Sequence, residues 1–261
     1  MAFGLIIIGD EILSGKRSDK HLPKVIELLG ERGLRLGWAE IVGDDPARIT
    51  ALLERSFAGG DIVFSCGGIG ATPDDHTRQC AAAALGVPLV LHPEGKLLVQ
   101  ERIRDTAREA GIEADLDAPE NLQRLKMAEF PQGSTLIPNP YNRIAGFSVR
   151  DHHFVPGFPV MAWPMIEWVL DSHYSHLFHA SVHLERSLIV YEQAEASLTP
   201  LMEALERDYP GLRVFSLPSV GDARTRRHIE LGVKGAPAQV EPAFLAMQAE
   251  LQRRGAEFQL L

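Results

Sequence analysis

The residues best suited to chemistry form one glycine-rich stretch, GGIGATPDDHT at positions 67–77. Glycine lets a backbone turn sharply and bring its N–H groups close to an anion, and the helical pattern that follows adds the positive end of a helix dipole. The stretch therefore predicts a phosphate site. Asp74 and Asp75 would repel a phosphate group, so their presence indicates a magnesium ion between protein and ligand. The alternative is a solvated turn in which an aspartate only caps the helix.

Two further acidic loops contain glycine: GDEILSG at 9–15 and VGDD at 42–45. Each follows a predicted strand, and ligands of open parallel sheets bind outside the carboxyl ends of the strands. We therefore expect the three loops to converge at one rim. With a phosphoanhydride substrate, Asp44 and Asp75 would hold the metal and orient water, while the glycine amides would stabilise charge on the phosphoryl oxygens.

The elements that position these loops are apolar runs of strand length alternating with helical patterns, as in a parallel sheet covered by helices. The predicted strands are 3–8, 34–42 and 61–66, and the predicted helices are 22–29, 46–58, 78–85, 94–110 and 161–170. Short strands are expected from residue 136, and 111–121 is expected to be a loop. Asp45 followed by Pro46 has the form of a helix N-cap.

The rest of the chain has a different element order. Strand 184–191, helix 198–207, strands 212–217 and 227–234, and helix 237–254 predict a small α+β domain. We therefore expect two domains, an α/β domain at 1–178 and a smaller β-α-β-β-α domain at 179–261. In the first, His152 and His153 precede an apolar strand, where alternation would bury one and expose the other.

Composition narrows the function classes. The 261 residues carry a formal charge of -9, which disfavours nucleic acid as a partner. No apolar run approaches the roughly 20 residues that cross a bilayer, so neither secretion nor membrane insertion is expected. Cys66 and Cys80 are too few for a disulfide framework and fit a reducing cytoplasm.

Four motifs in order, GDEILSG, VGDD, GGIGATPDDHT and NPYNRIAGF, resemble the molybdopterin-binding superfamily, specifically the amino-terminal region of the competence-damage-inducible protein A (CinA) family. The resemblance implies a three-layer α/β fold that binds a pterin or a nucleotide diphosphate, a small domain similar to the family's middle domain, and a homo-oligomer. It further implies metal-dependent cleavage of ADP-ribose, as in CinA-type members, or adenylyl transfer to molybdopterin, as in other relatives.

The resemblance also implies roles for individual residues. Asp44 and Asp75 match the acidic pair to which catalysis is attributed, and they would bind the metal. The implied ligand-binding residues are Gly9 and Glu11 in the first loop, Gly67, Gly68, Gly70, Thr72, Asp74 and Thr77 in the glycine-rich stretch, and Asn139 and Gly157 further along.

The chain departs from the family pattern in several places, and the asparagine-containing stretch usual after the first loop is here Arg17, Ser18, Asp19, Lys20 and His21. Asn142 stands where a glycine is usual, although asparagine tolerates a positive φ, and Ala145 replaces a proline. Met161 replaces a carboxylate expected near the ligand. We therefore expect a magnesium-dependent hydrolase of a nucleotide diphosphate such as ADP-ribose, a nucleotide pyrophosphatase. The alternatives are a non-catalytic pterin- or nucleotide-binding protein and a molybdopterin adenylyltransferase.

Overall fold

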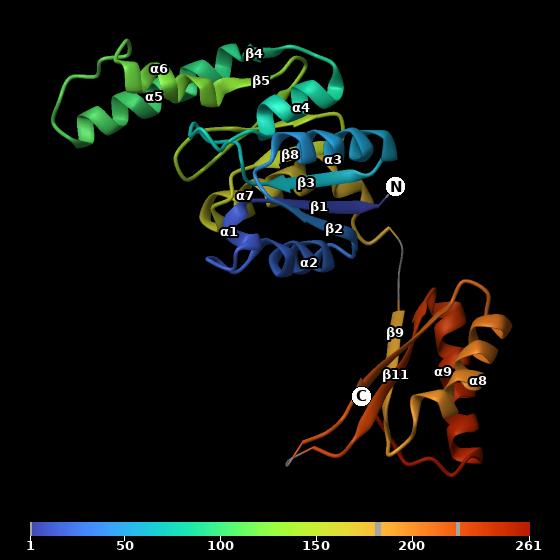
Figure 1. Ribbon diagram of the computed structural model, residues 1–261. Coiled ribbons are helices and arrows are strands. Elements are labelled where there is room, and N and C mark those ends of the chain that lie inside the picture. Colours follow the sequence, from blue (N-terminus) through green and yellow to red (C-terminus); the bar gives the residue numbers. More distant parts are fainter. Residues whose placement is uncertain (1, 181–183, 223–224) are drawn as a thin grey trace. The chain divides into compact units, whose positions relative to one another are not determined.

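The computed structural model describes residues 2–180, 184–222 and 225–261. The chain divides into two units, Met1–Phe178 and His179–Leu261. In Figure 1 the first unit runs from blue to yellow and the second from orange to red.

A six-stranded sheet, ordered β2-β1-β3-β8-β7-β6, forms the centre of the larger unit. Its strands are β1 (Phe3–Ile8), β2 (Leu36–Val42), β3 (Ile62–Cys66), β6 (Thr135–Ile137), β7 (Gly146–Val149) and β8 (His152–Val155). The pairs β1–β2, β1–β3 and β3–β8 are parallel, whereas β7 is antiparallel to both of its neighbours. The mostly parallel sheet expected from the sequence is confirmed.

Helices cover both faces of this sheet (Figure 1). They are α1 (Asp10–Leu13), α2 (His21–Glu31), α3 (Pro46–Gly59), α4 (Thr77–Leu85) and α7 (Pro159–His173). Leu5 and Ile7 of β1 pack in one core cluster with residues of α2 and α7, and Ile6 and Ile8 pack in another with residues of α3 and α4. A strand buried on both faces explains the unbroken apolar run of β1, and the three-layer fold is confirmed.

Helix α3 begins as its sequence predicts. The Asp45 side chain accepts a hydrogen bond from the amide of Arg48 at 2.9 Å, and Pro46 occupies the first turn. This cap satisfies one of the amides that a helix N-terminus leaves unpaired. It places Asp44, the last residue before the cap, at the carboxyl end of β2.

Between α4 and β6 lies an excursion, which we define as residues 89–131. It contains β4 (Leu89–Leu91), α5 (Pro93–Glu109), α6 (Pro119–Leu125), a 3₁₀ turn at Lys126–Ala128, and β5 (Glu129–Pro131), which pairs antiparallel with β4. The expectation of a loop over 111–121 is wrong at its end, because α6 starts at Pro119. With seven residues, of which only Asn121 is buried, this helix has no apolar periodicity to reveal it.

The expectation that one of His152 and His153 is exposed is also wrong, since both are buried. Strand β8 lies inside the sheet and is covered on both faces. His152 Nε2 lies 2.7 Å from Ser56 Oγ, and His153 bridges Ser148 Oγ at 2.8 Å and Tyr174 Oη at 2.7 Å. Burial lowers the pKa of His152 to about 4 and that of His153 to about 3, so both rings are neutral near pH 7.

The smaller unit is a four-stranded antiparallel sheet, ordered β10-β11-β9-β12, with two helices packed on it. Its elements are β9 (Leu184–Tyr191), α8 (Glu195–Asp208), β10 (Arg213–Ser219), β11 (His228–Gly235), α9 (Pro237–Arg253) and β12 (Phe258–Leu260). A small α+β domain is thus confirmed, and β12 is an addition to the predicted elements. Among the described residues, no helix is long and apolar enough to cross a bilayer.

Candidate functional site

The loops that follow β1, β2 and β3 meet at the carboxyl edge of the larger unit's sheet. The amide of Gly9 donates to the Val42 carbonyl at 3.0 Å. Asp10 and Asp44 exchange two bonds, from the Asp10 amide to Asp44 Oδ2 at 2.8 Å and from the Asp44 amide to Asp10 Oδ1 at 3.2 Å. The amide of Gly67 donates to Val155 at the end of β8. Convergence of the loops at one rim is therefore confirmed.

The turn after β3 requires glycine at its first two positions. Gly67 and Gly68 have φ angles of 109° and 67°, which side chains disfavour. A Cβ atom on Gly67 would lie 2.2 Å from the Ile8 carbonyl oxygen, and one on Gly68 would lie 2.2 Å from Thr77 Oγ1. The turn is therefore wedged between β1 and the first residue of α4.

Carbonyl groups of this turn are held by donors within the protein. Thr77 donates twice, from Oγ1 to the Gly67 carbonyl and from its amide to the Gly68 carbonyl. Arg78 Nη2 donates to the Gly70 carbonyl, and Gln123 Nε2 donates to the Ala71 carbonyl. The Asp75 amide donates to the Thr72 carbonyl. By contrast, the amides of Gly68, Ile69, Gly70 and Ala71 donate no hydrogen bond to any described residue. The turn therefore offers donors and few acceptors, which suits an anionic ligand.

Asp75 and Asp44 are each oriented through one carboxylate oxygen. Oδ2 of Asp75 accepts from the Thr72 amide at 2.9 Å and from Thr72 Oγ1 at 2.5 Å. Oδ2 of Asp44 accepts from the Asp10 amide. Within the described chain, Oδ1 of each residue has no hydrogen-bonding partner, so one oxygen of each carboxylate is available to a ligand.

The electrostatic setting of Asp44 favours a cation. Partial burial raises the pKa of this carboxyl group, and the charges of Asp10, Glu11 and Asp74 raise it further, against a bond from the Asp10 amide that lowers it. No group of three or more histidine, cysteine or acidic side chains among the residues described is arranged to hold a metal by itself. Mg²⁺ commonly takes one or two carboxylates and completes its shell with water and substrate phosphate. Asp44 and Asp75 each keep one carboxylate oxygen without a partner among the described residues, whereas the acidic charges that act on Asp44 are those of Asp10, Glu11 and Asp74 and not that of Asp75.

Next to the first loop, a cleft of about 400 Å³ opens. It is lined by Glu11, Ile12, Arg17, Ser18, Asp19, Lys20, His21, Gly157, Phe158 and Pro159. Glu11 and Gly157 were expected at the site. Arg17, Lys20 and His21 stand out in the sequence only as a departure from the family pattern and were not expected at the site, although three nitrogen-bearing side chains within five residues beside an acidic loop are a usable signal for anion binding.

His21 ties two walls of this cleft together. Its Nε2 lies 3.1 Å from the Gly157 carbonyl oxygen, and because a carbonyl can only accept, this nitrogen carries the proton. Asp19 accepts from the amides of His21 and Leu22 and so caps α2. The start of α2 is thereby fixed against the loop that follows β8.

Asn139 serves its own loop. Its Nδ2 donates to Asn142 Oδ1 at 2.9 Å and to the Ile144 carbonyl at 3.0 Å, and its Oδ1 accepts from the Tyr141 amide. The positive φ in this loop is taken by Arg143, with φ 65°, and not by Asn142, although asparagine tolerates that conformation. Asn142 Nδ2 instead lies 3.7 Å from Met161 Sδ, so two of the positions that depart from the family pattern contact each other.

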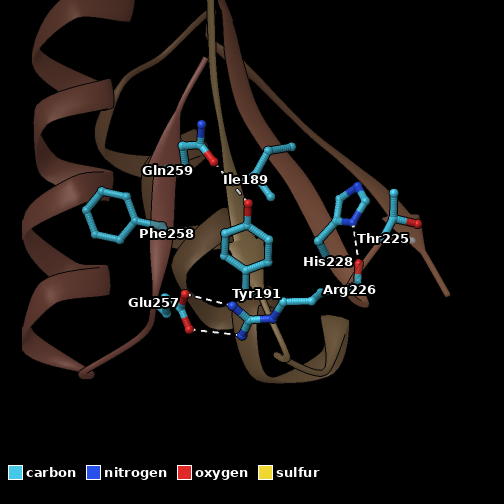
Figure 2. Close-up of a pocket in the computed structure, with 8 residues that line it drawn as sticks. All are labelled: Ile189, Tyr191, Thr225, Arg226, His228, Glu257, Phe258 and Gln259. Carbon is cyan, nitrogen blue, oxygen red and sulfur yellow. Dashed lines mark hydrogen bonds and ion pairs between the residues drawn. The ribbon is translucent and has the colours of Figure 1, made fainter. Parts of the chain in front are cut away.

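The smaller unit has its own cavity, of about 570 Å³, which the sequence did not indicate (Figure 2). We call it the small-unit pocket; its lining is Ile189, Tyr191, Thr225, Arg226, His228, Glu257, Phe258 and Gln259. Arg226 makes a bidentate ion pair with Glu257 at 2.8 and 2.9 Å, and its guanidinium carbon lies 4.6 Å from the centre of the Tyr191 ring. The Tyr191 hydroxyl donates to Gln259 Oε1 at 3.0 Å.

Comparison with known proteins places the larger unit in a family. The family model described as "Probable molybdopterin binding domain" matches residues 4–176. A CinA-like protein of Anaeromyxobacter sp. (strain Fw109-5) is 30% identical over 249 residues, which are 88% of this chain and 58% of that protein. A CinA-like protein of Anaeromyxobacter dehalogenans (strain 2CP-C) is 34% identical over 175 residues, 65% of this chain and 40% of that protein. The chain thus spans about half the length of these curated relatives.

Among solved structures, the chain is similar to the protein CinA with unknown function from Thermoplasma acidophilum. The TM-score is 0.56 at 23% identity, over 66% of this chain and 98% of that one. This likeness supports the fold. The match of the family model over most of the larger unit shows the family: the chain belongs to the molybdopterin-binding domain family, and the curated relatives to which it is similar are CinA-like proteins.

Proposed function

We propose that the larger unit binds a nucleotide diphosphate at the rim and hydrolyses its phosphoanhydride bond with Mg²⁺, ADP-ribose being the substrate class tested first. The observation that carries the proposal is the turn at 67–72. Five of its six carbonyls, all but that of Ile69, accept hydrogen bonds inside the protein, while the amides of Gly68, Ile69, Gly70 and Ala71 donate to no described residue. Such amides suit the charge that develops on phosphoryl oxygens, and they need no reorganisation when the ligand arrives.

The acidic residues supply the second requirement. Oδ1 of Asp44 and Oδ1 of Asp75 would hold Mg²⁺, which when bound neutralises phosphate charge and polarises the phosphoryl group. Each carboxylate is kept in place through Oδ2, by the Asp10 amide for Asp44 and by Thr72 for Asp75. Water would add across the P–O–P bridge of ADP-ribose, giving AMP and ribose 5-phosphate.

Each neighbouring loop residue has a part in this scheme. The turn takes its shape from Gly67, Gly68 and Thr77. The Gly70 amide would donate to a phosphate oxygen, and Thr72 orients Asp75 through its hydrogen bonds to the carboxylate. Glu11, Asp74 and Gly9 border the acidic rim, where like charges would be relieved by a divalent ion. Arg17 and Lys20 in the cleft would bind the further anionic or ribose part of the ligand.

The test is incubation of the full chain with ADP-ribose and MgCl₂, with AMP measured by chromatography. We expect AMP from the wild-type protein and a loss of at least about 100-fold in Asp44→Asn and Asp75→Asn, the scale typical of removing a catalytic group. Asp171→Asn, an exposed residue of α7 paired with Arg32, is the matched control and retains activity. Absence of AMP from the wild-type protein would sink the hydrolase proposal.

A second candidate is a pterin- or nucleotide-binding protein without turnover. Met161 favours it, because a thioether in contact with Asn142 stands where the family pattern has a carboxylate. This candidate predicts that ADP-ribose or a pterin raises the melting temperature while no product forms, since a ligand of the native state alone stabilises it. Molybdopterin-dependent consumption of ATP would instead indicate adenylyl transfer.

A further inference from the structure

Arg78 is a buried cation whose hydrogen-bonding partners are all backbone carbonyls. It lies in the first turn of α4, is 2% exposed, and pairs with no carboxylate at ion-pair distance in the described chain. Burying a guanidinium without an ion-pair partner is unfavourable unless hydrogen bonds satisfy it. A residue of this kind needs an explanation beyond filling the core.

The side chain of Arg78 joins the glycine turn to the excursion. Nη2 donates to the Gly70 carbonyl at 2.5 Å, while Nη1 donates to the Lys126 carbonyl and, at 3.4 Å, to the Glu129 carbonyl. Gln123 of α6 makes a parallel connection, from Nε2 to the Ala71 carbonyl at 3.1 Å. Two consecutive peptide groups of the turn are thus held by side chains whose positions depend on the excursion.

Because a peptide group is planar, a hydrogen bond to its carbonyl also fixes the direction of its N–H group. In a planar trans peptide, the C=O of one residue and the N–H of the next point in opposite directions. Holding the Gly70 carbonyl therefore aims the unpaired amide of Ala71 away from Arg78. Holding the Ala71 carbonyl fixes the amide of Thr72, which donates to Asp75 Oδ2. The excursion thereby influences the direction of the Ala71 amide, a proposed anion donor, and the position of Asp75, a proposed metal ligand.

We propose that Arg78 and Gln123 are positioning residues through which the excursion sets the Ala71 amide and the Asp75 carboxylate. The expected effect on catalysis rests on the proposed function. The expected effect on the geometry of the turn does not. Neither side chain needs to touch the substrate. The excursion then contributes to the geometry of the site.

The catalytic test uses ADP-ribose and MgCl₂ with Gln123→Met, Arg78→Ala and two controls. Gln123 is exposed, so Gln123→Met keeps the fold; we expect kcat to fall by about 3- to 10-fold with a smaller change in KM, because Asp75 is affected more than binding. For Arg78→Ala we expect a loss of about 10- to 100-fold, partly restored by millimolar guanidinium, which can occupy the vacated space. Arg124→Met in the excursion and Gln132→Met directly after it retain full activity, because neither residue bonds to the turn among the described contacts.

A readout independent of activity separates this inference from the proposed function. Hydrogen exchange of the Thr72 amide, which is bonded to Asp75, should accelerate in Gln123→Met and in Arg78→Ala but not in the controls. If the wild-type protein makes no AMP, the hydrolase proposal fails and the exchange data alone decide on positioning. Unchanged Thr72 exchange in both variants overturns the inference. So does a loss of activity that follows only the unfolding midpoint and that guanidinium does not restore.

Discussion

The glycine turn of the larger unit and the small-unit pocket show why cavity size is a poor guide to a binding site. The small-unit pocket is larger, about 570 Å³ against about 400 Å³ for the cleft beside the turn, and it contains an arginine, a histidine and a tyrosine. Yet Arg226 is already paired with Glu257, and Tyr191 already donates to Gln259 (Figure 2). In the turn, backbone donors have no partner among the described residues.

Unsatisfied hydrogen-bonding capacity is therefore the better indicator. A ligand entering the small-unit pocket would have to break an ion pair before it gained a contact with the guanidinium, whereas a ligand at the turn gains bonds without displacing any within the protein. The same contrast extends to titratable groups, since the larger unit buries neutral histidines and the smaller unit pairs its charges at the surface.

The largest effect we expect concerns those histidines. Their folded-state pKa values, about 4 for His152 and about 3 for His153, lie below the ordinary 6.5, so the unfolded state binds more protons between these values. The stability they confer is complete above pH 6.5 and is lost as pH falls toward 4 and then 3, on the order of 3 kcal/mol for His152 and about 5 kcal/mol for His153. Urea unfolding followed by tryptophan fluorescence reports on the larger unit alone, because Trp38, Trp163 and Trp168 all lie there.

His153→Gln sharpens this prediction, because glutamine is neutral at every pH. The variant should be less stable at pH 7 but show a flatter fall in midpoint between pH 6.5 and 4. His228→Gln, in the small-unit pocket, is the control and should leave the pH dependence of the tryptophan signal unchanged. An equal pH slope in wild type and His153→Gln would contradict the assignment.

The next effect tests the shape of the turn. Gly67→Ala places a Cβ atom 2.2 Å from the Ile8 carbonyl at a φ of 109°, so we expect destabilisation by about 2–3 kcal/mol and loss of AMP formation. Gly30→Ala, in α2 with open space around the added methyl group, should be neutral or stabilising by up to about 1 kcal/mol. Equal stability of the two variants in urea would show that the turn is not constrained as described.

Asp44→Asn should move stability and activity in opposite directions. The raised pKa of Asp44 means that folding disfavours its ionised form, so the neutral amide should stabilise the metal-free protein at pH 7 by a few tenths of a kcal/mol, a small figure because the side chain is largely solvated. The same substitution should abolish AMP formation. Thermal melting without MgCl₂ measures the first effect, and a variant less stable than wild type would show that Asp44 serves the fold and not the site.

How far the sequence predicts this molecule depends on how local each signal is. The buried run of β1, the cap at Asp45 and the glycine pattern of the turn all follow from adjacent residues, and the structure has them as expected. Helix α6 lacks periodicity, and the burial of His152 and His153 depends on β8 lying inside the sheet. These features require knowledge of tertiary neighbours.

The site shows the same limit. Glu11, Asp44, Gly67 and Asp75 stand in motifs and were predicted, but Arg78 acquires its meaning only from the Lys126 carbonyl, 48 residues further along the chain. Arg17 and Lys20 are recognised as candidate ligand-binding residues only because they line the cleft. A magnesium requirement, a cytoplasmic location and a homo-oligomeric state stay predictions.

The smallest effect is expected at Arg226, and it is the one best able to break the comparison. The pKa of Arg226 is raised by its bond to Glu257, but the group is fully exposed, so salt screens the pair and little stability depends on it. Arg226→Ala should therefore leave AMP formation from ADP-ribose unchanged and lower the unfolding midpoint of the smaller unit only slightly, a difference that 0.5 M NaCl, roughly a 4 Å screening length, should remove. Glu257→Gln should behave alike, because it removes the same pair from the other side. Either variant could instead reduce AMP formation as much as Asp75→Asn does. The small-unit pocket, whose polar groups are already paired, would then matter to the reaction as much as the turn does. Unused hydrogen-bonding capacity would no longer be a valid criterion for locating the site.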